Sequence, residues 1–292
     1  MFRTHQNAHR GGTASIPARH SPPQSSTMEV ECAELTHCGK VREHNEDYLG
    51  RVLPETPAKG RSHGWLFALA DGVGGQESGE IASRTAVESM LAGFRAAPPG
   101  EQLSAQLTRL VQAANHKVYE AGMGMGPGGV AMATTLVACI LRFDRVVVAH
   151  VGDSRCYLIR RGHASQLTRD HTIANEHVRL GILSSREAAE TDTRHVLSRS
   201  LGGNLFVKPE TSEHLILTGD ILLLCSDGLH GSVGGAEMAS VVGRSSNLEM
   251  AAQSLVELAN EWDGNDNISV QLIRVRGVER VGMYRGRPYK LR

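Results

Sequence analysis

Several short apolar runs, separated by only a few polar residues, constrain the fold of this chain more than any other feature. Residues 135–141, 146–151 and 156–159 are β-branched or apolar, and two to four polar residues separate each run from the next. Runs of this length and composition are typical of β-strands. Because connections this short cannot contain a crossover helix, they predict antiparallel pairing.

Helical periodicity appears on both sides of these runs. Residues 81–94, 103–118 and 248–262 carry apolar side chains at the spacing of one helix face. Capping boxes are predicted at Ser184–Glu187 and at Ser246–Glu249. Strands do not alternate with helices, and no G-x-G-x-x-G follows a strand, which argues against a dinucleotide-binding fold. The prediction is an α+β domain in which helices flank a β-sandwich, with further strands at residues 28–35, 65–70, 215–217, 221–225 and 268–275.

Charge is unevenly distributed along the 292 residues, although 31 basic side chains balance 31 acidic ones. Residues 1–28 contain three arginines and no acid, and residues 276–292 contain six basic residues and one glutamate. We therefore expect a disordered basic tail at 1–28, one domain at 29–275 and a basic C-terminal tail at 276–292. The acidic body between the tails argues against nucleic-acid binding and permits carboxylates to gather around cations.

Other classes of protein are disfavoured by what the sequence lacks. No run of about 18 apolar residues is present, so no transmembrane helix is predicted. The five cysteines are odd in number and form no C-x-x-C pair, which argues against a disulfide framework or a zinc ribbon. The first 28 residues have no apolar core of the kind that a secretory signal needs. Together these observations predict a cytoplasmic protein.

Carboxylates stand where four of the apolar runs begin or end: Asp71, Asp153, Asp227 and Asp266. Strands hold such side chains at the edge of a sheet, where several can converge on one point. Converging carboxylates raise one another's pKa unless a cation balances them, and ligands that are all oxygen select Mg²⁺ or Mn²⁺ over zinc. The alternative is that Asp71 and Asp227 belong to ordinary turns, because each precedes a glycine and Asp-Gly is a common turn dipeptide.

Three further features leave more than one interpretation open. The segment V-R-E-H-N-E-D at 41–47 is either a solvated loop or a place where Arg42 binds an oxyanion beside further metal ligands. Residues 172–195 interrupt the strand pattern with few apolar side chains, which predicts low local stability. His150 lies inside an apolar run and is interpreted as a structural histidine rather than a metal ligand.

Six segments carry a resemblance to a known family. In order they are V-R-E-H-N-E-D, A-D-G-V-G-G-Q-E-S-G-E, A-H-V-G-D-S-R-C-Y-L-I-R, Q-L-T-R-D-H-T, C-S-D-G-L and D-N-I-S-V. This order resembles that of the metal-dependent serine/threonine protein phosphatases (type 2C, or PPM), in particular their bacterial branch, over roughly residues 30–275. The resemblance implies an α-β-β-α sandwich of two antiparallel sheets flanked by helices. It also implies that a metal-activated hydroxide hydrolyses phosphoserine and phosphothreonine at a dinuclear Mn²⁺ or Mg²⁺ centre.

The resemblance assigns roles to the acids when it is carried over position by position. It implies that Asp71 bridges the two metals and that the Gly72 carbonyl is a ligand of one of them. Asp227 and Asp266 would complete the coordination of the other metal. These assignments are expectations taken from the family pattern.

The same pattern extends to residues around the acids. Either Glu46 or Asp47 is expected to reach the cluster, directly or through water, and Arg42 is expected to hold the substrate phosphate. Asp153 matches the position that binds a third, weaker metal in bacterial members. Residues 172–195 match the variable flap beside the active site.

Two departures from the family pattern bear on the mechanism. Val73 stands where many eukaryotic relatives have a histidine that is a candidate general acid, and Ala133 replaces the usual glycine before two threonines.

The implied partners are phosphorylated proteins, including a cognate Ser/Thr kinase and its substrates. Two alternatives remain: a pseudophosphatase that binds phosphoproteins without efficient turnover, and a phosphatase of small molecules.

Overall fold

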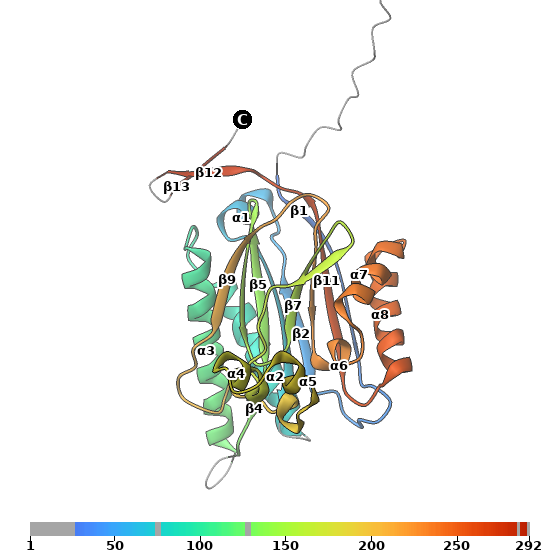
Figure 1. The fold of residues 1–292 in the computed structure, drawn as a ribbon. Helices are drawn as coiled ribbons and strands as arrows, with labels where there is room; N and C mark the ends of the chain where they lie inside the picture. Colours follow the sequence, from blue (N-terminus) through green and yellow to red (C-terminus); the bar gives the residue numbers. More distant parts are fainter. Residues whose placement is uncertain (1–26, 74–76, 126–129, 285–286, 291–292) are drawn as a thin grey trace, which may run out of the picture.

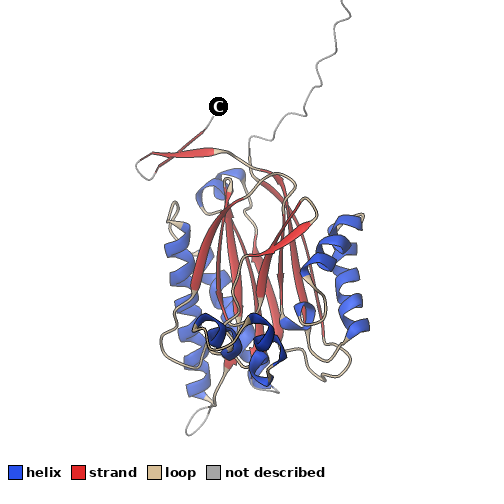
Figure 2. Ribbon diagram, in the orientation of Figure 1, coloured by secondary structure: helices blue, strands red, loops and turns tan. Residues whose placement is uncertain are grey.

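Two antiparallel β-sheets pack face to face, and helices cover both outer surfaces (Figure 1, Figure 2). This computed structural model describes residues 27–73, 77–125, 130–284 and 287–290. Helices and sheets are stacked in the order α-β-β-α, so the predicted fold class is confirmed.

The two sheets have simple neighbour orders. One is five-stranded, in the order β1 (Glu29–His37), β11 (Ile268–Gly277), β10 (Ile221–Cys225), β7 (Arg155–Arg160) and β8 (His163–Gln166). The other has the path β2 (Asp47–Val52), β3 (Trp65–Val73), β5 (Leu136–Arg142), β6 (Arg145–Val151) and β9 (Glu210–Leu215). The short strand β4 (Ala133–Thr134) pairs with the end of β3. All pairs are antiparallel, as the short connections predict.

Long amphipathic helices bury the outer face of each sheet. Helices α2 (Glu77–Arg95) and α3 (Leu103–Gly124) lie on the β2–β9 sheet, and α7 (Gly235–Arg244) and α8 (Leu248–Trp262) lie on the other. Apolar side chains fill three layers: one between each pair of helices and its sheet, and one between the sheets. Burial of this apolar surface is the main stabilising term of the fold.

Short helices occupy the connections. Helix α1 (Pro57–Ser62) lies between β2 and β3, and α6 (Asp227–His230) follows β10 directly. The flap, residues 172–195, contains α4 (Ile173–Arg179), α5 (Ser185–Glu190) and a 3-10 turn at Asp192–His195. The capping box predicted at Ser184–Glu187 is present at the start of α5. The flap helices bury few side chains, among them Ala174 and Ala188.

Two local predictions are wrong. The strand expected at 215–217 lies instead at Glu210–Leu215, where half-buried and exposed side chains alternate with little apolar content. Leu217 belongs to the turn that follows, because its N–H donates to the Asp220 carboxylate at 2.7 Å. The cap of α8 is Asn247, whose side chain accepts from the Met250 N–H at 2.7 Å, and not Ser246. The strand was placed on the apolar residues 215–217 although β9 is mostly polar, and the cap was placed one residue too early.

The structure describes most of the predicted C-terminal tail but almost none of the predicted N-terminal one. The tail at 1–28 lies outside the described residues except for its last two positions. The segment 276–292 contains a two-stranded hairpin of β12 (Val281–Tyr284) and β13 (Arg287–Lys290), which lies beside the sandwich in Figure 1. Among the described residues no helix is long and apolar enough to cross a membrane.

One end of the sandwich collects the strand ends that matter for function. Strand β2 begins and strand β3 ends at the same place, since Asp47 pairs with Asp71. Strand β10 ends and β11 begins there as well, and β4, α6 and the flap helices lie at this lower end in Figure 1. Antiparallel topology therefore brings together acids that lie far apart in the sequence.

Candidate active site

Five aspartates come together at this end of the sandwich: Asp47, Asp71, Asp153, Asp227 and Asp266. Each affects the pKa of at least one other, so their carboxyl groups are close enough to interact electrostatically. The set includes every aspartate that the strand ends predicted, with Asp47 added from the 41–47 segment. We call these five residues the acid cluster.

Asp71 is held rigidly by its neighbours at the end of β3. The Asp71 N–H donates to the Thr135 hydroxyl at 3.0 Å, and the Thr134 hydroxyl donates to the Asp71 carbonyl at 2.8 Å. Thr135 also exchanges a hydrogen bond of 2.7 Å with Ser154. The two threonines thus fix the backbone from which the Asp71 carboxyl enters the cluster.

The sequence left open whether Glu46 or Asp47 reaches the cluster, and the structure has Asp47 among the acids. Its buried carboxyl points toward the other acids, and the Ser226 hydroxyl donates to Asp47 Oδ2 at 2.8 Å. Burial, followed by the charges of Asp227 and Asp266, raises the pKa of Asp47 to about 7. Its second oxygen, Oδ1, is buried and has no hydrogen-bond partner within the described residues.

Glu46 lies at the edge of the same site. A Cβ atom on Gly79, at the start of α2, would collide with the Glu46 carboxylate, so the glycine makes room for it. Gly72 is also constrained, because its N–H donates to the Glu46 carbonyl at 3.1 Å and a Cβ there would collide with the Gly79 carbonyl oxygen. Gly72 and Gly79 therefore permit the close approach of β2, β3 and α2.

The electrostatics of the cluster indicate a missing positive charge. Burial and the neighbouring carboxylates raise the pKa of Asp71 well above its usual range and also raise that of Asp227. Asp266 adds to the rise in the pKa of Asp227, and the neighbouring Asp71 carboxyl offsets part of it. Asp227 Oδ1 is buried without a partner among the described residues, like Asp47 Oδ1. Buried carboxylate oxygens without a partner fit a hard divalent cation such as Mn²⁺ or Mg²⁺.

Arg42 lies beside the cluster rather than inside it. Its Nη2 donates to Asp266 Oδ2 at 2.7 Å, and 49% of its side chain is exposed. The hydrogen bond to Asp266 raises the pKa of Arg42, with smaller effects from Glu46 and Asp71. A guanidinium that is exposed and adjacent to a metal site is able to reach a phosphate that enters from solvent.

Asn267 is a functional residue that sequence reasoning missed. Its buried amide accepts from the Glu46 N–H at 2.8 Å and donates to the carbonyls of Cys38 and His44, both at 2.9 Å. It therefore fixes the loop that carries Arg42. The motif D-N-I-S-V contains this residue, but its partners lie more than 200 positions away and no local pattern indicates them.

Asp153 lies in the cluster beside Asp227 and near a second group of charged residues, Arg155 and Asp170. Burial, then the charges of Asp227 and Asp170, raises the pKa of Asp153 to about 7. Arg155 balances Asp170 through two hydrogen bonds of 2.9 and 2.6 Å, so the Asp153 carboxyl keeps no dedicated cation. His230, whose pKa burial lowers to about 4, donates to the Asp153 carbonyl at 3.0 Å.

The flap contributes a second residue that the sequence did not single out. His195, at the end of the 3-10 turn, is close enough to Asp227 to lower its pKa. The Arg194 Nε donates to His195 Nε2 at 2.8 Å. The expectation that the flap lies beside the active site agrees with this contact. With 14 histidines in the chain, nothing in the sequence distinguishes His195 from the others.

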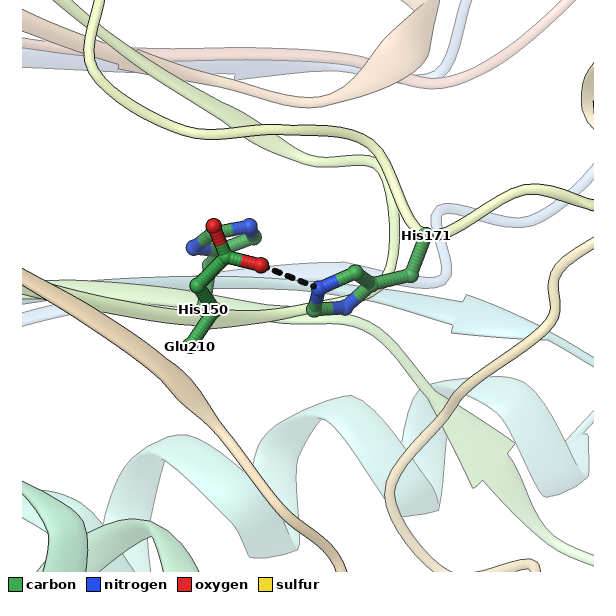
Figure 3. A group of neighbouring side chains, drawn as sticks. All are labelled: His150, His171 and Glu210. Atoms are coloured by element: carbon green, nitrogen blue, oxygen red, sulfur yellow. Dashed lines mark hydrogen bonds and ion pairs between the residues drawn. The ribbon is translucent and has the colours of Figure 1, made fainter. Parts of the chain in front are cut away.

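A second group of possible ligands, outside the acid cluster, consists of His150, His171 and Glu210 (Figure 3). His171 Nδ1 accepts from the Gly152 N–H at 3.2 Å, and its Nε2 lies 3.4 Å from Glu210 Oε2 and 3.5 Å from Arg199 Nη1. Both ring nitrogens of His171 therefore have partners within the protein. His150 bonds to the Arg169 carbonyl at 2.8 Å and stacks on His171, which makes it a structural histidine, as the sequence predicts.

Known proteins resemble this chain over most of its length. The family model for protein phosphatase 2C matches residues 36–262. The serine/threonine phosphatase stp of Listeria innocua is 35% identical over 256 residues, which cover 86% of this chain and 96% of the relative. The serine/threonine phosphatase of S. agalactiae has a TM-score of 0.77 at 32% identity and covers 85% of this chain and 100% of its own. The catalytic domain of the phosphatase PstP, solved with two manganese ions, has a TM-score of 0.71 at 32% identity, with coverage of 85% and 99%.

Proposed function

This chain belongs to the protein phosphatase 2C family, and on that premise we propose that it hydrolyses phosphoserine and phosphothreonine in proteins at the acid cluster. It is a metal-dependent serine/threonine protein phosphatase. The observation that carries the proposed site is the pair of buried, unpartnered oxygens on Asp47 and Asp227 among acids of raised pKa.

The residues that would hold the metals follow from the family pattern and from position. Asp71 would be shared by two Mn²⁺ or Mg²⁺ ions and the Gly72 carbonyl would be a ligand of one of them. Asp227 and Asp266 would complete the coordination of the other. When bound, such ions activate the attacking water and offset the charge of the phosphoryl group. Of the two acids Glu46 and Asp47, we propose Asp47 as the one that belongs to the metal site, because it has a buried oxygen without a partner in the cluster.

The remaining residues act on the substrate and on the ligands. Arg42 binds the phosphate oxygens and orients the ester, exchanging part of its ion pair with Asp266 for the substrate. Asn267 fixes the Arg42 loop, and Thr134 fixes the backbone of Asp71. Val73, 39% exposed at the end of β3, carries no titratable group, so it cannot protonate the leaving group as a histidine there would.

Asp153 supports a third, weaker metal position. Its carboxyl is buried beside Asp227, and Arg155 is occupied by Asp170. With one dedicated acid in place, the affinity of this position would be lower than that of the central pair.

The pseudophosphatase alternative is not supported. Loss of a metal-bridging acid would be its mark, and Asp71, Asp227 and Asp266 are all present. The relatives reported above are named as phosphatases. The proposed substrates are phosphorylated proteins, including a cognate Ser/Thr kinase and its targets. A cytoplasmic location stays a prediction from the cysteine pattern.

Hydrolysis of matched peptides tests the proposal. Phosphoserine, phosphothreonine and phosphotyrosine peptides of the same sequence, together with p-nitrophenyl phosphate, are assayed with Mn²⁺, with Mg²⁺ and with EDTA. We expect turnover of the first two peptides and of p-nitrophenyl phosphate with metal only. Preference for phosphotyrosine, or turnover of p-nitrophenyl phosphate without any phosphopeptide activity, would contradict the proposed substrate class.

A further inference from the structure

A small polar pocket lies at the base of the flap, where the chain leaves it and crosses toward β9. Its volume is about 230 Å³, and the side chains that give it its chemistry are Ser198, Arg199, Ser200, Asn204 and Lys208, with Phe206 at its rim. It is separate from the acid cluster, because none of the five aspartates lines it.

The polar groups of this pocket are largely unused. Within the described part of the chain, the side chains of Ser198, Ser200, Asn204 and Lys208 have no hydrogen-bond or ion-pair partner. Arg199 already has two partners, because its Nη2 donates to Glu176 Oε1 at 3.2 Å and its Nη1 lies 3.5 Å from His171 Nε2. The lining contains two cationic side chains and no carboxylate, which is the composition of a site for an anion.

A buried asparagine holds the wall of the pocket in place. Asn115 has no exposed surface and lies on the apolar face of α3. Its Oδ1 accepts from the Gly202 N–H at 2.9 Å, and its Nδ2 donates to the carbonyls of Asn204 and Leu205 at 2.9 and 3.0 Å. Gly202 has φ +85°, and a Cβ there would collide with the Met132 carbonyl oxygen. The pocket is therefore preorganised by the core, which lowers the entropic cost of binding.

The same wall is tied to the catalytic strand. Leu201 forms a β-bridge with Thr134, with backbone hydrogen bonds of 2.8 and 3.2 Å. Thr134 in turn donates to the Asp71 carbonyl at 2.8 Å. On the other side, Thr172 and Leu197 form a bridge that closes the base of the flap. Leu201 and Thr134 therefore connect the wall of the pocket directly to the strand that carries Asp71.

We infer that this pocket binds an anionic side chain of the phosphoprotein substrate, either a carboxylate or a second phosphate, a few residues from the one that is hydrolysed. The inference rests on the proposed function, since it specifies the substrate of the same active site. Lys208 and Arg199 supply charge, and the hydroxyls of Ser198 and Ser200 supply hydrogen bonds. The substrate class is then phosphoproteins with acidic or multiply phosphorylated segments.

The test uses phosphothreonine peptides that differ at one scanned position. At each flanking position the peptide carries alanine, glutamate or phosphoserine. For the wild type and for Lys208→Ala and Ser200→Ala, kcat/KM is measured with Mn²⁺, and Kd is measured in EDTA, where no turnover is expected. The matched control is Lys59→Ala, an exposed lysine on α1 at the opposite end of the sandwich. The glutamate and phosphoserine arms distinguish the two sources of the anion.

We expect one or two positions at which an anion lowers Kd and KM on the order of fivefold in the wild type, as a charge-assisted contact near the surface would. Lys208→Ala should abolish that advantage, Ser200→Ala should reduce it, and Lys59→Ala should keep it. Turnover of p-nitrophenyl phosphate should stay unchanged in all three variants. The advantage should also weaken with added salt.

Two results overturn the inference: equal Kd and kcat/KM for all peptides in the wild type, or an anion advantage that survives Lys208→Ala. Failure of the proposed function looks different, because then no phosphopeptide is turned over with Mn²⁺. Even in that case the Kd comparison decides whether the pocket binds anionic side chains.

Discussion

Asp47 and Asp71 lie directly opposite each other on the antiparallel strands β2 and β3, with both carboxyls turned into the acid cluster. Like charges in this position are unfavourable between strands. A fold that keeps two acids there is strained unless a cation lies between them. On the proposed function, the pair would link the stability of this end of the sandwich to metal binding.

Replacement of Asp71 separates the repulsion between the two acids from their role in metal binding. In EDTA, we expect Asp71→Asn to melt about 2–4 °C above the wild type, because it removes a like-charge contact. With Mn²⁺ it should lose both the metal-induced rise in Tm and at least about 100-fold in kcat. Thermal melts with and without metal, beside a p-nitrophenyl phosphate assay, measure both effects.

The matched control is Asp144→Asn, at the opposite end of the sheets. Asp144 is buried and lies 3.6 Å from the Arg145 guanidinium, so its loss should lower Tm and leave kcat unchanged. If Asp71→Asn were destabilised in EDTA as much as the control, the electrostatic account of the cluster would be wrong.

Arg42 should affect binding more than turnover. Arg42→Ala removes a guanidinium that reaches phosphate from solvent, so KM for p-nitrophenyl phosphate should rise on the order of tenfold, with a smaller loss in kcat. Arg42→Lys should recover part of the affinity, since it keeps the charge without the fork. An unchanged KM combined with a lower Tm would identify Arg42 as a structural partner of Asp266 only.

Asp153 should matter most when metal is scarce. Asp153→Asn is expected to keep the tightly bound metals and to require more Mn²⁺ for half-maximal turnover than the wild type, because the weak position has lost its acid. A Mn²⁺ titration of kcat measures the difference. Identical titration curves would make Asp153 a residue of the turn after β6.

The pH dependence of metal stabilisation follows from the raised pKa values. The pKa of Asp47 and that of Asp153 are about 7 in the folded protein without metal, against about 4 in an unfolded chain. Between these values the folded state holds more protons than the unfolded state, so the stability of the metal-free protein falls as pH rises. Metal binding displaces these protons, so the Mn²⁺-induced rise in Tm should grow from about pH 5 to about pH 8.

Two buried histidines make the stability of the folded protein fall as pH falls, which is the opposite trend. The comparison is therefore made on the difference in Tm with and without Mn²⁺. The pKa of His171 and that of His230 are lowered to about 4 by burial, so their contribution to stability is lost as pH falls below about 6.5. This loss is the same with and without Mn²⁺ and cancels in the difference in Tm. A metal-induced rise that shrinks at high pH would contradict the account.

How far the sequence predicts this site depends on the kind of signal each residue carries. Asp71 and Asp227 follow runs that are wholly apolar, which predicts their positions at the ends of buried strands, although the sequence also allowed ordinary Asp-Gly turns. Asp47 was ambiguous, because β2, with the sequence D-Y-L-G-R-V, has little strand periodicity and only its pairing with β3 shows where Asp47 points.

Other residues carried no local signal at all. Asn267 and His195 lie close to residues that are distant in the sequence. Asn115 is a polar residue on the apolar face of a helix, and only its three hydrogen bonds to the 202–205 loop explain it. Strand β9 was misplaced because its alternating side chains are mostly polar and its position depends on β6. In each case tertiary contacts decide what local sequence cannot.

The central claim is that the acid cluster is a metal centre that performs the hydrolysis. The most direct measurement is equilibrium dialysis of the EDTA-treated protein against Mn²⁺, with the same samples assayed on a phosphothreonine peptide. The account predicts two tightly bound ions per chain, turnover that appears as they bind, and loss of both in Asp227→Asn. Full turnover in EDTA, or turnover restored without Mn²⁺ bound to the chain, would contradict it.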